Sequence, residues 1–183
     1  MIRLFDIVVG VLGLLCAVPL ILLAMVATYI DTGLPLVCCT FRLGRHGRPF
    51  TFYKIRTMYQ NAPPIHYTKP QHDTRVTPVG RVLRCWSLDE LLQFWHLVTG
   101  DMAVFGPRPW LVRESPLLGR YATDILSRKP GLVNAYVAFG RSDLSMEDRL
   151  KLDAKFARRM NWRQCLHALT RLVMRLLDQK GAR

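Results

Sequence analysis

The stretch that decides the fold runs from Arg81 to Pro109 and reads RVLRCWSLDELLQFWHLVTGDMAVFGPRP. An adjacent pair of acids, Asp89 and Glu90, follows a helix-start signal and precedes an apolar run. The stretch closes on an arginine between two prolines, Pro107-Arg108-Pro109. It therefore combines acids, cations and a buried helix within about thirty residues, and we interpret the rest of the chain around it.

The acid pair fits two interpretations. Ser87-Leu88-Asp89-Glu90 matches a capping box, in which the serine and Glu90 side chains satisfy each other's backbone amides and the acids complement the helix dipole. Alternatively, an ionised carboxylate at a helix start keeps a low pKa and can act as a nucleophile, while its neighbour holds a hard divalent cation. These four residues alone leave both interpretations open.

The apolar run after the acids predicts a helix that is covered by protein or lipid over most of its circumference and ends at Thr99-Gly100. Arg108 follows that helix. Because proline fixes its own φ and restricts the residue before it, Arg108 is held in a restricted backbone. A rigidly presented guanidinium suits bidentate binding of a phosphate, although an ordinary turn that carries an arginine looks the same in sequence.

The N-terminal segment is long enough for a membrane. No charged side chain occurs from Ile7 to Ile30, and about 24 residues cover roughly 36 Å as a helix. The run is too long for a cleaved signal peptide and no A-x-A-like site follows it. Pro19 predicts a kink near its middle. Positive residues flank both ends, which suits a segment that enters and returns on one face, but a tilted span with a tolerated proline is equally compatible.

Two short extended runs, LVCCTFR and PFTFYK, surround LGRHGR and predict a β-hairpin with a loop longer than two residues. Lys54 and Arg56 are two positions apart at its end, so we expect them on one face, where they would meet either a phosphate or solvent. From Tyr59 to Val79, four prolines indicate a surface loop. We expect His66 and His72 in that loop to be solvated rather than metal ligands.

The C-terminal part predicts helices. Ser145 with Asp148 three residues later favours a helix start. Farther on, apolar and basic residues each recur at helical spacing on different sides, which predicts a basic amphipathic helix at a membrane surface; a helix packed on the protein core is the alternative. The apolar side comprises Trp162, Leu166, Leu169, Val173, Leu176 and Leu177, and the basic side Arg163, His167, Arg171 and Arg175.

The positive net charge of the chain predicts an anionic partner. The 183 residues carry a net charge of +13, although half of them are hydrophobic. Nucleic acid, an acidic membrane and a phosphorylated substrate would all fit this charge. A nucleic-acid-binding protein is the weaker hypothesis, because no binding motif of that kind occurs and the run from Ile7 to Ile30 would stay unexplained. The five cysteines lack C-x-x-C spacing, so we expect reduced thiols rather than disulfides or a zinc site.

Several motifs together resemble one family. A hydrophobic segment with a proline in its middle precedes GRHGRPFTFYKIRTM, then RVLRCWSLDEL, then GDMAVFGPRP. In this order the motifs resemble the bacterial sugar transferases known as monotopic phosphoglycosyl transferases, over about Arg3 to Arg141. Val18 stands where the family has serine before the proline, Leu92 where it has proline, and His96 where it has asparagine. The region from Asn134 to Ala138 also departs from the family pattern.

The resemblance implies a function. Members transfer a phosphosugar from a UDP-sugar to undecaprenyl phosphate at the cytoplasmic face of the bacterial inner membrane and release UMP. It implies Asp89 as the nucleophile that forms a covalent phosphosugar intermediate, and Glu90 as a catalytic residue and ligand of Mg²⁺. It also makes five cations candidates for binding substrate phosphates: Lys54, Arg56, Arg84, Arg108 and Arg141.

We therefore expect a mainly α fold with a small β-hairpin. Residues 1–35 would form a re-entrant, proline-broken membrane helix, and residues 36–183 a cytoplasmic catalytic domain with interfacial amphipathic helices. The expected partners are the UDP-sugar, undecaprenyl phosphate and membrane lipid, and not nucleic acid. A catalytically inactive membrane scaffold related to these enzymes is the alternative. The sugar, the glycan pathway and the oligomeric state do not follow from the sequence.

Overall fold

A computed structural model describes residues 3–60, 73–135, 138 and 144–178, with side chains as far as residue 174. This part is mainly helical, with one antiparallel and one parallel pair of strands. In chain order the elements are α1 (Arg3–Thr32), β1 (Val37–Leu43), η1 (Arg45–Gly47), β2 (Pro49–Ile55), α2 (Pro78–Cys85), η2 (Leu88–Glu90), α3 (Gln93–Thr99), β3 (Ala103–Phe105), η3 (Val112–Tyr121), α4 (Ala122–Leu126), β4 (Gly131–Val133), α6 (Met146–Arg159) and α7 (Trp162–Asp178).

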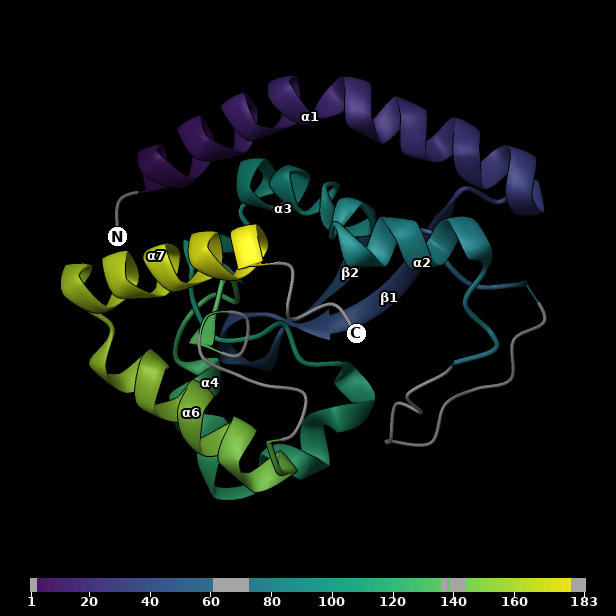
Figure 1. Cartoon of the computed structure of the whole chain (residues 1–183). Helices are drawn as coiled ribbons and strands as arrows, with labels where there is room; N and C mark the ends of the chain where they lie inside the picture. Colours follow the sequence, from purple (N-terminus) through teal and green to yellow (C-terminus); the bar gives the residue numbers. More distant parts are fainter. Residues whose placement is uncertain (1–2, 61–72, 136–137, 139–143, 179–183) are drawn as a thin grey trace.

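Helix α1 arches over one face of the molecule, with α2 and α3 beneath it and α4 and α6 at the opposite end (Figure 1). Pro19 lies inside this helix, and the arch confirms a bend rather than two separate helices. Within the described part of the chain, α1 is the one helix long and apolar enough to cross a membrane. Most of its large apolar side chains point away from the protein.

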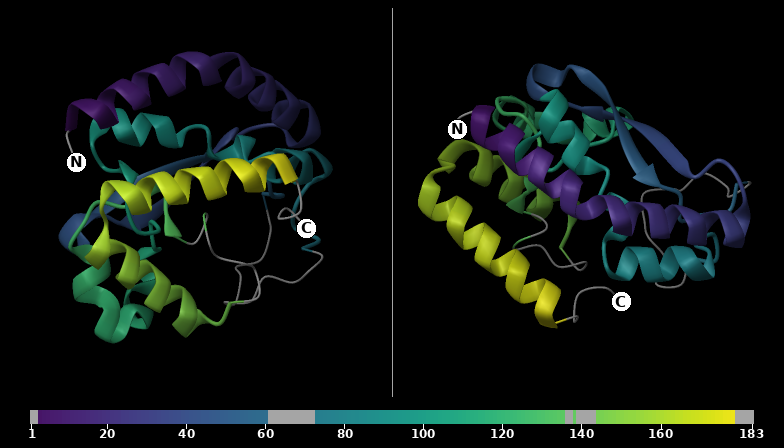
Figure 2. Two further views of the ribbon diagram at one scale, coloured as in Figure 1. Left: turned by 60° about the vertical axis from the view of Figure 1, so that its left-hand side comes forward. Right: turned by 90° about the horizontal axis from the view of Figure 1, so that it is seen from above.

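The protein-facing side of α1 is narrow and built from small residues. Its buried positions are three, four or seven residues apart, as expected for one face of a helix: Asp6, Gly10, Ala17, Ile21, Ala24 and Thr28. A Cβ on Gly10 would lie 2.9 Å from the Cβ of Leu97 on α3, so glycine allows the two helices to approach closely. Seen from above, α1 and α3 lie against each other along this contact (Figure 2).

Both ends of α1 are tied to the rest of the protein. At its start, the Arg3 guanidinium donates to the carbonyl groups of Leu97 and Val98 at the end of α3. One turn later, the buried Asp6 accepts from the backbone N–H of Val104 at 2.9 Å. At its end, the Arg56 guanidinium donates to the Thr32 and Gly33 carbonyl groups at 3.0 and 2.6 Å. The helix is therefore fixed to one domain at both termini.

The predicted hairpin is confirmed. Strands β1 and β2 pair antiparallel from Val37 opposite Ile55 to Leu43 opposite Pro49. Their connection contains the short turn η1, in which His46 and Gly47 adopt positive φ, so the loop is indeed longer than two residues. Cys38 lies opposite Lys54 in this register. Lys54 therefore lies near the open end of the hairpin, one residue before β2 ends.

A second strand pair was not predicted from the sequence. Strand β3 pairs in parallel with β4, although each has three residues and the second follows a Lys-Pro-Gly turn signal. The two backbones approach so closely that a Cβ on Gly106 would lie 2.2 Å from the Lys129 carbonyl oxygen. Only glycine fits there, and the contact holds the end of β3 in place.

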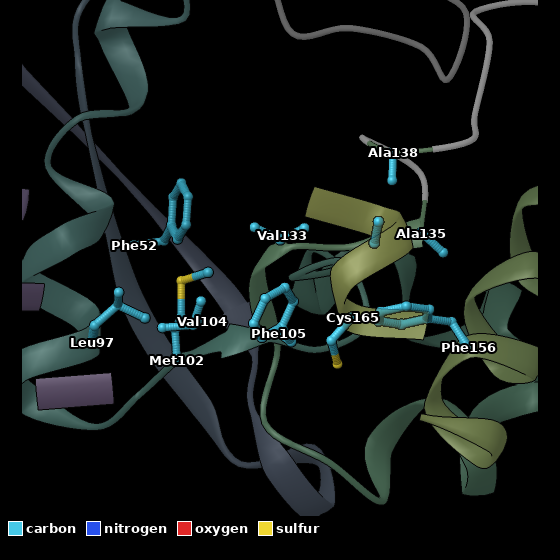
Figure 3. Packing of buried hydrophobic residues seen from close by; sticks show 11 residues of the cluster. Phe52, Leu97, Met102, Val104, Phe105, Val133, Ala135, Ala138, Phe156 and Cys165 are labelled. Atoms are coloured by element: carbon cyan, nitrogen blue, oxygen red, sulfur yellow. The ribbon is translucent and has the colours of Figure 1, made fainter. Parts of the chain in front are cut away.

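The core lies between the hairpin and the C-terminal helices. Its members come from β2, α3, the β3–β4 pair, α6 and α7, and Figure 3 shows them from close by. They include Phe52, Leu97, Met102, Phe105, Val133, Phe156 and Cys165. This core binds the segment after α3 to the C-terminal third of the chain.

The C-terminal helices match the sequence in different ways. The Ser145 side chain caps α6 by accepting from the Asp148 N–H at 3.1 Å, which confirms the predicted helix start. In α7, the residues buried in the core are small ones, Cys165 and Ala168. Four of the large apolar residues predicted to share one face have described side chains, and all four are exposed: Trp162 at 69%, Leu166 at 52%, Leu169 at 39% and Val173 at 46%. These four side chains do not cover the protein's own core.

The cysteines are free, as expected. Cys16, Cys38, Cys39 and Cys85 are exposed and Cys165 is buried. The predicted loop from Tyr59 is confirmed at its described ends, except that α2 already begins at Pro78. His66 and His72 lie outside the described residues.

Candidate active site

The acid pair lies in η2, a single tight turn between α2 and α3. Ser87 before it adopts a left-handed conformation (φ 55°, ψ 24°) and its side chain makes no capping hydrogen bond. The predicted capping box is therefore wrong. Because Ser87 is in the left-handed region, it does not have the extended backbone that a capping residue needs. Asp89 and Glu90 are therefore not explained by a capping box.

Lys54 brings a positive charge to both acids. Its Nζ lies 3.9 Å from Oδ2 of Asp89, and it forms an ion pair with Oε1 of Glu90. The side chain of Asp89 is 8% exposed and that of Glu90 is 43% exposed. One acid is thus enclosed, whereas the other reaches solvent at the edge of the same site.

The enclosure of Asp89 changes its acidity. Burial raises the pKa of Asp89; Glu90 adds to this increase, whereas the charges of Lys54 and Arg84 oppose it. The low pKa expected for a carboxylate at a helix start is therefore wrong, because loss of water outweighs the helix end in this short turn. A carboxylate with a raised pKa is a stronger nucleophile once it is ionised, and the neighbouring cations favour that form.

Glu90 behaves in the opposite way. Burial works against its ionisation, but Lys54, Gln93 and Arg108 together outweigh burial and lower the pKa of Glu90. The two adjacent carboxyl groups therefore differ in chemistry as well as exposure. Asp89 is the more basic group, and Glu90 is the more permanently charged one.

Arg84 and Arg108 act on the acid pair through their charge, Arg84 on Asp89 and Arg108 on Glu90. Arg84 on α2 is exposed, and its Nε donates to Thr57 Oγ1 at 2.8 Å. Arg108 follows β3 and is the one residue from Val104 to Trp110 that is not buried. Its positive charge acts on Glu90. Of the predicted cations, Lys54, Arg84 and Arg108 thus lie near enough to act on the charge of the acid pair, whereas their binding of substrate phosphates stays a prediction.

The loop that carries Arg108 is held by its neighbours. Gly131 N–H donates to the Pro107 carbonyl at 2.8 Å, and Arg42 Nη1 donates to the Pro109 carbonyl at 2.9 Å. The restricted backbone predicted for Arg108 is thereby fixed from both sides. The guanidinium projects from a rigid base, which suits recognition of a phosphate.

Comparison with known proteins settles the family. The profile of the bacterial sugar transferases matches residues 1–179. The chain belongs to the bacterial sugar transferase family.

Its relatives in this family include proteins of known name. Exopolysaccharide production protein ExoY of Sinorhizobium fredii is 34% identical over 176 residues, which cover 87% of this chain and 77% of that protein. The uncharacterized sugar transferase EpsL of Bacillus subtilis is 31% identical over 98% of this chain and 88% of its own length. Undecaprenyl-phosphate galactose phosphotransferase of Salmonella typhimurium is 35% identical over 87% of this chain but only 36% of that longer protein.

Arg56 does not reach the acid pair. It lies just beyond β2, is 7% exposed, and its guanidinium donates to the end of α1, including Thr32 Oγ1 at 2.7 Å. Its guanidinium is thus engaged with the end of α1 in this structure, and the role of Arg56 in binding substrate stays a prediction. Arg141, the last of the predicted cations, lies outside the described residues.

Two residues of the site were missed. Arg42 on β1 lies over the ring of Phe52, 5.1 Å from its centre, and burial, with a contribution from Arg108, lowers its pKa to about 10. It remains charged at neutral pH and adds to the positive field. Gln93 is buried at the start of α3 and hydrogen-bonds Glu90. An arginine within an otherwise apolar strand is the signal that could have revealed Arg42; Gln93 gives none.

The acid pair fits the magnesium ion that the resemblance implies. Among the described residues, no group of three or more His, Cys, Asp or Glu side chains could hold a metal ion. Magnesium in phosphoryl transfer needs fewer protein ligands, because it is held by one or two carboxylates together with substrate phosphates and water. Glu90 supplies an accessible carboxylate of the required hard-oxygen type.

Proposed function

We propose that the protein transfers a phosphosugar from a UDP-sugar to undecaprenyl phosphate and releases UMP. Family membership, and relatives whose names state transfer of galactose or glucose phosphate to undecaprenyl phosphate, support this proposal. The relative from Komagataeibacter xylinus is 31% identical over 85% of this chain and 32% of that protein. Both proposed substrates are anionic, which agrees with the net charge of +13.

Asp89 would act as the nucleophile. Its carboxylate attacks the β-phosphorus of the donor, a bond to the phosphosugar forms, and UMP leaves. The phosphate of undecaprenyl phosphate then attacks the same phosphorus, which returns the carboxylate and yields the lipid diphosphosugar. The observation that carries this assignment is the enclosed Asp89 within 3.9 Å of Lys54, beside a more acidic and more exposed Glu90.

The cations would offset charge as the phosphates approach. Two anionic substrates meet one carboxylate in this reaction, so positive groups must be in place beforehand. Lys54 keeps Asp89 ionised, whereas Arg84 and Arg108 are placed for the donor phosphates. Magnesium, when bound at Glu90, would supply further charge neutralisation at the phosphate oxygens.

Substitution of Asp89 tests the assignment. In nanodiscs with undecaprenyl phosphate and magnesium, we expect UDP-galactose, UDP-glucose or another UDP-sugar to release UMP. Asp89→Asn should lower this rate by about 10³-fold or more, because an amide cannot form the acyl phosphate. With donor alone, intact-protein mass spectrometry should show one phosphosugar on the parental chain and none on the variant.

The controls separate the alternatives. Asp148→Asn, an exposed change on α6, should leave the rate unchanged. UMP release by Asp89→Asn at the parental rate would disprove the nucleophile. A folded parental chain without turnover across the panel would instead favour a non-catalytic membrane scaffold.

We also propose that α1 enters and leaves the membrane on the cytoplasmic side. Arg3 and Asp6 at its start, and Arg56 at its end, all bind the same domain. A helix that crossed the bilayer would separate these ends by the full hydrocarbon thickness of about 30 Å and break one set of contacts. The positive flanks then lie on one face, in agreement with the charge rule.

Exposed apolar side chains support the same placement. Besides those on α1, large ones project from the segments next to the acid pair, with Trp86 at 53% and Trp95 at 50% exposure. Trp162 and Leu166 of α7 are exposed as well. Tryptophan favours the membrane–water boundary. We therefore place the acid pair near the level of the lipid headgroups, where a lipid-held phosphate is within reach.

A further inference from the structure

Asp153 on α6 is a buried acid without a role in the function described so far. It is 1% exposed and lies beside a second cluster of buried apolar residues, separate from the core described above, which includes Trp110, Leu150 and Ala154. Burial raises the pKa of Asp153 to about 6, with Trp110 and Arg108 opposing the shift, so it is ionised at neutral pH. Such a charge is costly in a core, and an apolar residue of similar size would commonly be at least as stable.

The contacts of Asp153 point to the Arg108 loop. Its Oδ2 accepts from the backbone N–H of Arg108 at 3.4 Å and from the indole N–H of Trp110 at 3.0 Å. Its Oδ1 is buried and has no hydrogen-bond partner among the described residues. The carboxylate therefore serves two donors from one short segment.

Both donors bear on the position of the Arg108 side chain. One is the backbone of Arg108 itself. The other is the indole N–H of Trp110. The guanidinium of Arg108 lies over this ring, with its Cζ 5.7 Å from the ring centre. Pro107 and Pro109 on either side are held by Gly131 and Arg42. Asp153 thus contributes the one contact in this set that acts directly on the N–H of Arg108 and on the ring that supports it.

We propose that Asp153 is a positioning residue: it orients Arg108 so that the guanidinium meets the diphosphate of the donor. This inference rests on the proposed function for the identity of the diphosphate, but the positioning itself does not. It links α6, at the end of the molecule opposite α1, to the acid pair (Figure 1).

A matched pair of substitutions tests the inference. Asp153→Asn keeps the shape and one oxygen that can accept both N–H groups. Asp153→Leu keeps a similar volume but accepts nothing. In the full chain in nanodiscs, we expect Leu to weaken UDP binding about tenfold, the scale of one lost hydrogen bond to a charged group, and Asn to leave it near the parental value.

The double variant with Arg108 distinguishes positioning from a general structural effect. In an Arg108→Ala background, Asp153→Leu should weaken UDP binding no further, because the residue it positions is gone. An equal loss in both backgrounds, or no loss in either, would overturn the inference. Thermal unfolding of the four proteins checks that the fold is retained.

A second measurement is independent of the substrate. Hydrogen exchange of residues 106–110 should accelerate in Asp153→Leu and not in Asp153→Asn. If the parental chain neither binds UDP nor releases UMP, the proposed function fails and exchange alone decides: an unchanged rate in Asp153→Leu overturns the positioning role, and a faster one supports it.

Discussion

At the scale of single residues, the site depends on how differently two adjacent carboxyl groups are placed. Asp89 is enclosed and its pKa is raised by burial, whereas the pKa of Glu90 is lowered because nearby cations and Gln93 outweigh burial. The sequence predicts that the two acids have different roles, since neighbouring residues of a helical turn point in different directions. It does not predict which acid is buried, because that depends on the hairpin and on Lys54, more than thirty residues away.

Lys54 should control the pH dependence of the reaction. Its charge lowers the pKa of Asp89 against the effect of burial, so Lys54→Met should raise this pKa further. An acid with a higher pKa is ionised only at higher pH, and the acidic limb of kcat/KM should therefore move to higher pH. At neutral pH we expect a loss of about a hundredfold, since one stabilising donor is removed. UMP release from pH 5 to 9 measures both effects.

Lys151→Met is the matched control, because Lys151 is an exposed lysine on α6 that pairs only with exposed acids in the described structure. It should leave the profile unchanged. An acidic limb that stays in place in Lys54→Met would show that Lys54 does not hold Asp89 in its ionised form.

At the scale of elements, sequence patterns predicted structure correctly where the contacts join residues that are close in the chain. The hairpin and the Ser145 cap follow from alternation and a short-range hydrogen bond, and both are confirmed. Two features escaped prediction where neighbouring elements decide. The spacing of Ser87 and Glu90 does not reveal the left-handed turn, because that turn arises where α2 ends directly before it. The β3–β4 pair depends on Gly106 and Gly131 meeting across the chain.

The contact between α1 and α3 gives a prediction at this scale. Gly10→Leu should force the helices apart, because even a Cβ there lies 2.9 Å from Leu97 Cβ and 3.1 Å from the Phe94 carbonyl oxygen. We expect a loss of about 1–3 kcal/mol in the free energy of unfolding, as for overpacking elsewhere. Thermal unfolding in detergent measures it. Val11→Leu, at a site that is 41% exposed, should change nothing, and equal stability of both variants would contradict the close packing.

At the scale of the whole molecule, the arrangement of α1 decides how the protein sits in a membrane. In the sequence, Pro19 and the positive residues at both ends of the segment fit a bent re-entrant helix and a tilted transmembrane helix equally well. The structure adds the bonds from Arg3, Asp6 and Arg56, each of which joins residues far apart in the chain. These bonds support the proposed re-entrant placement, and no pattern within residues 1–35 contains this information.

Labelling of single cysteines tests the topology. In a cysteine-free background, Ile2→Cys and Arg45→Cys should both be protected from a membrane-impermeant maleimide added to intact cells and both react after the inner membrane is opened. Reaction at position 2 in intact cells, with position 45 protected, would show a span. In single-tryptophan variants, brominated lipids should quench Trp162, which is 69% exposed, and spare Trp110, which is 3% exposed.

The bonds at the start of α1 also bear on the order of synthesis. The acceptor of Arg3 at Leu97 lies 94 residues later in the chain, and the donor to Asp6 at Val104 lies 98 residues later. The apolar helix therefore leaves the ribosome long before its N-terminal anchors exist. In the proposed placement, α1 reaches the lipid before these anchors form, so a nascent chain stopped before residue 97 would lack the contacts that tie the start of α1 to the rest of the protein.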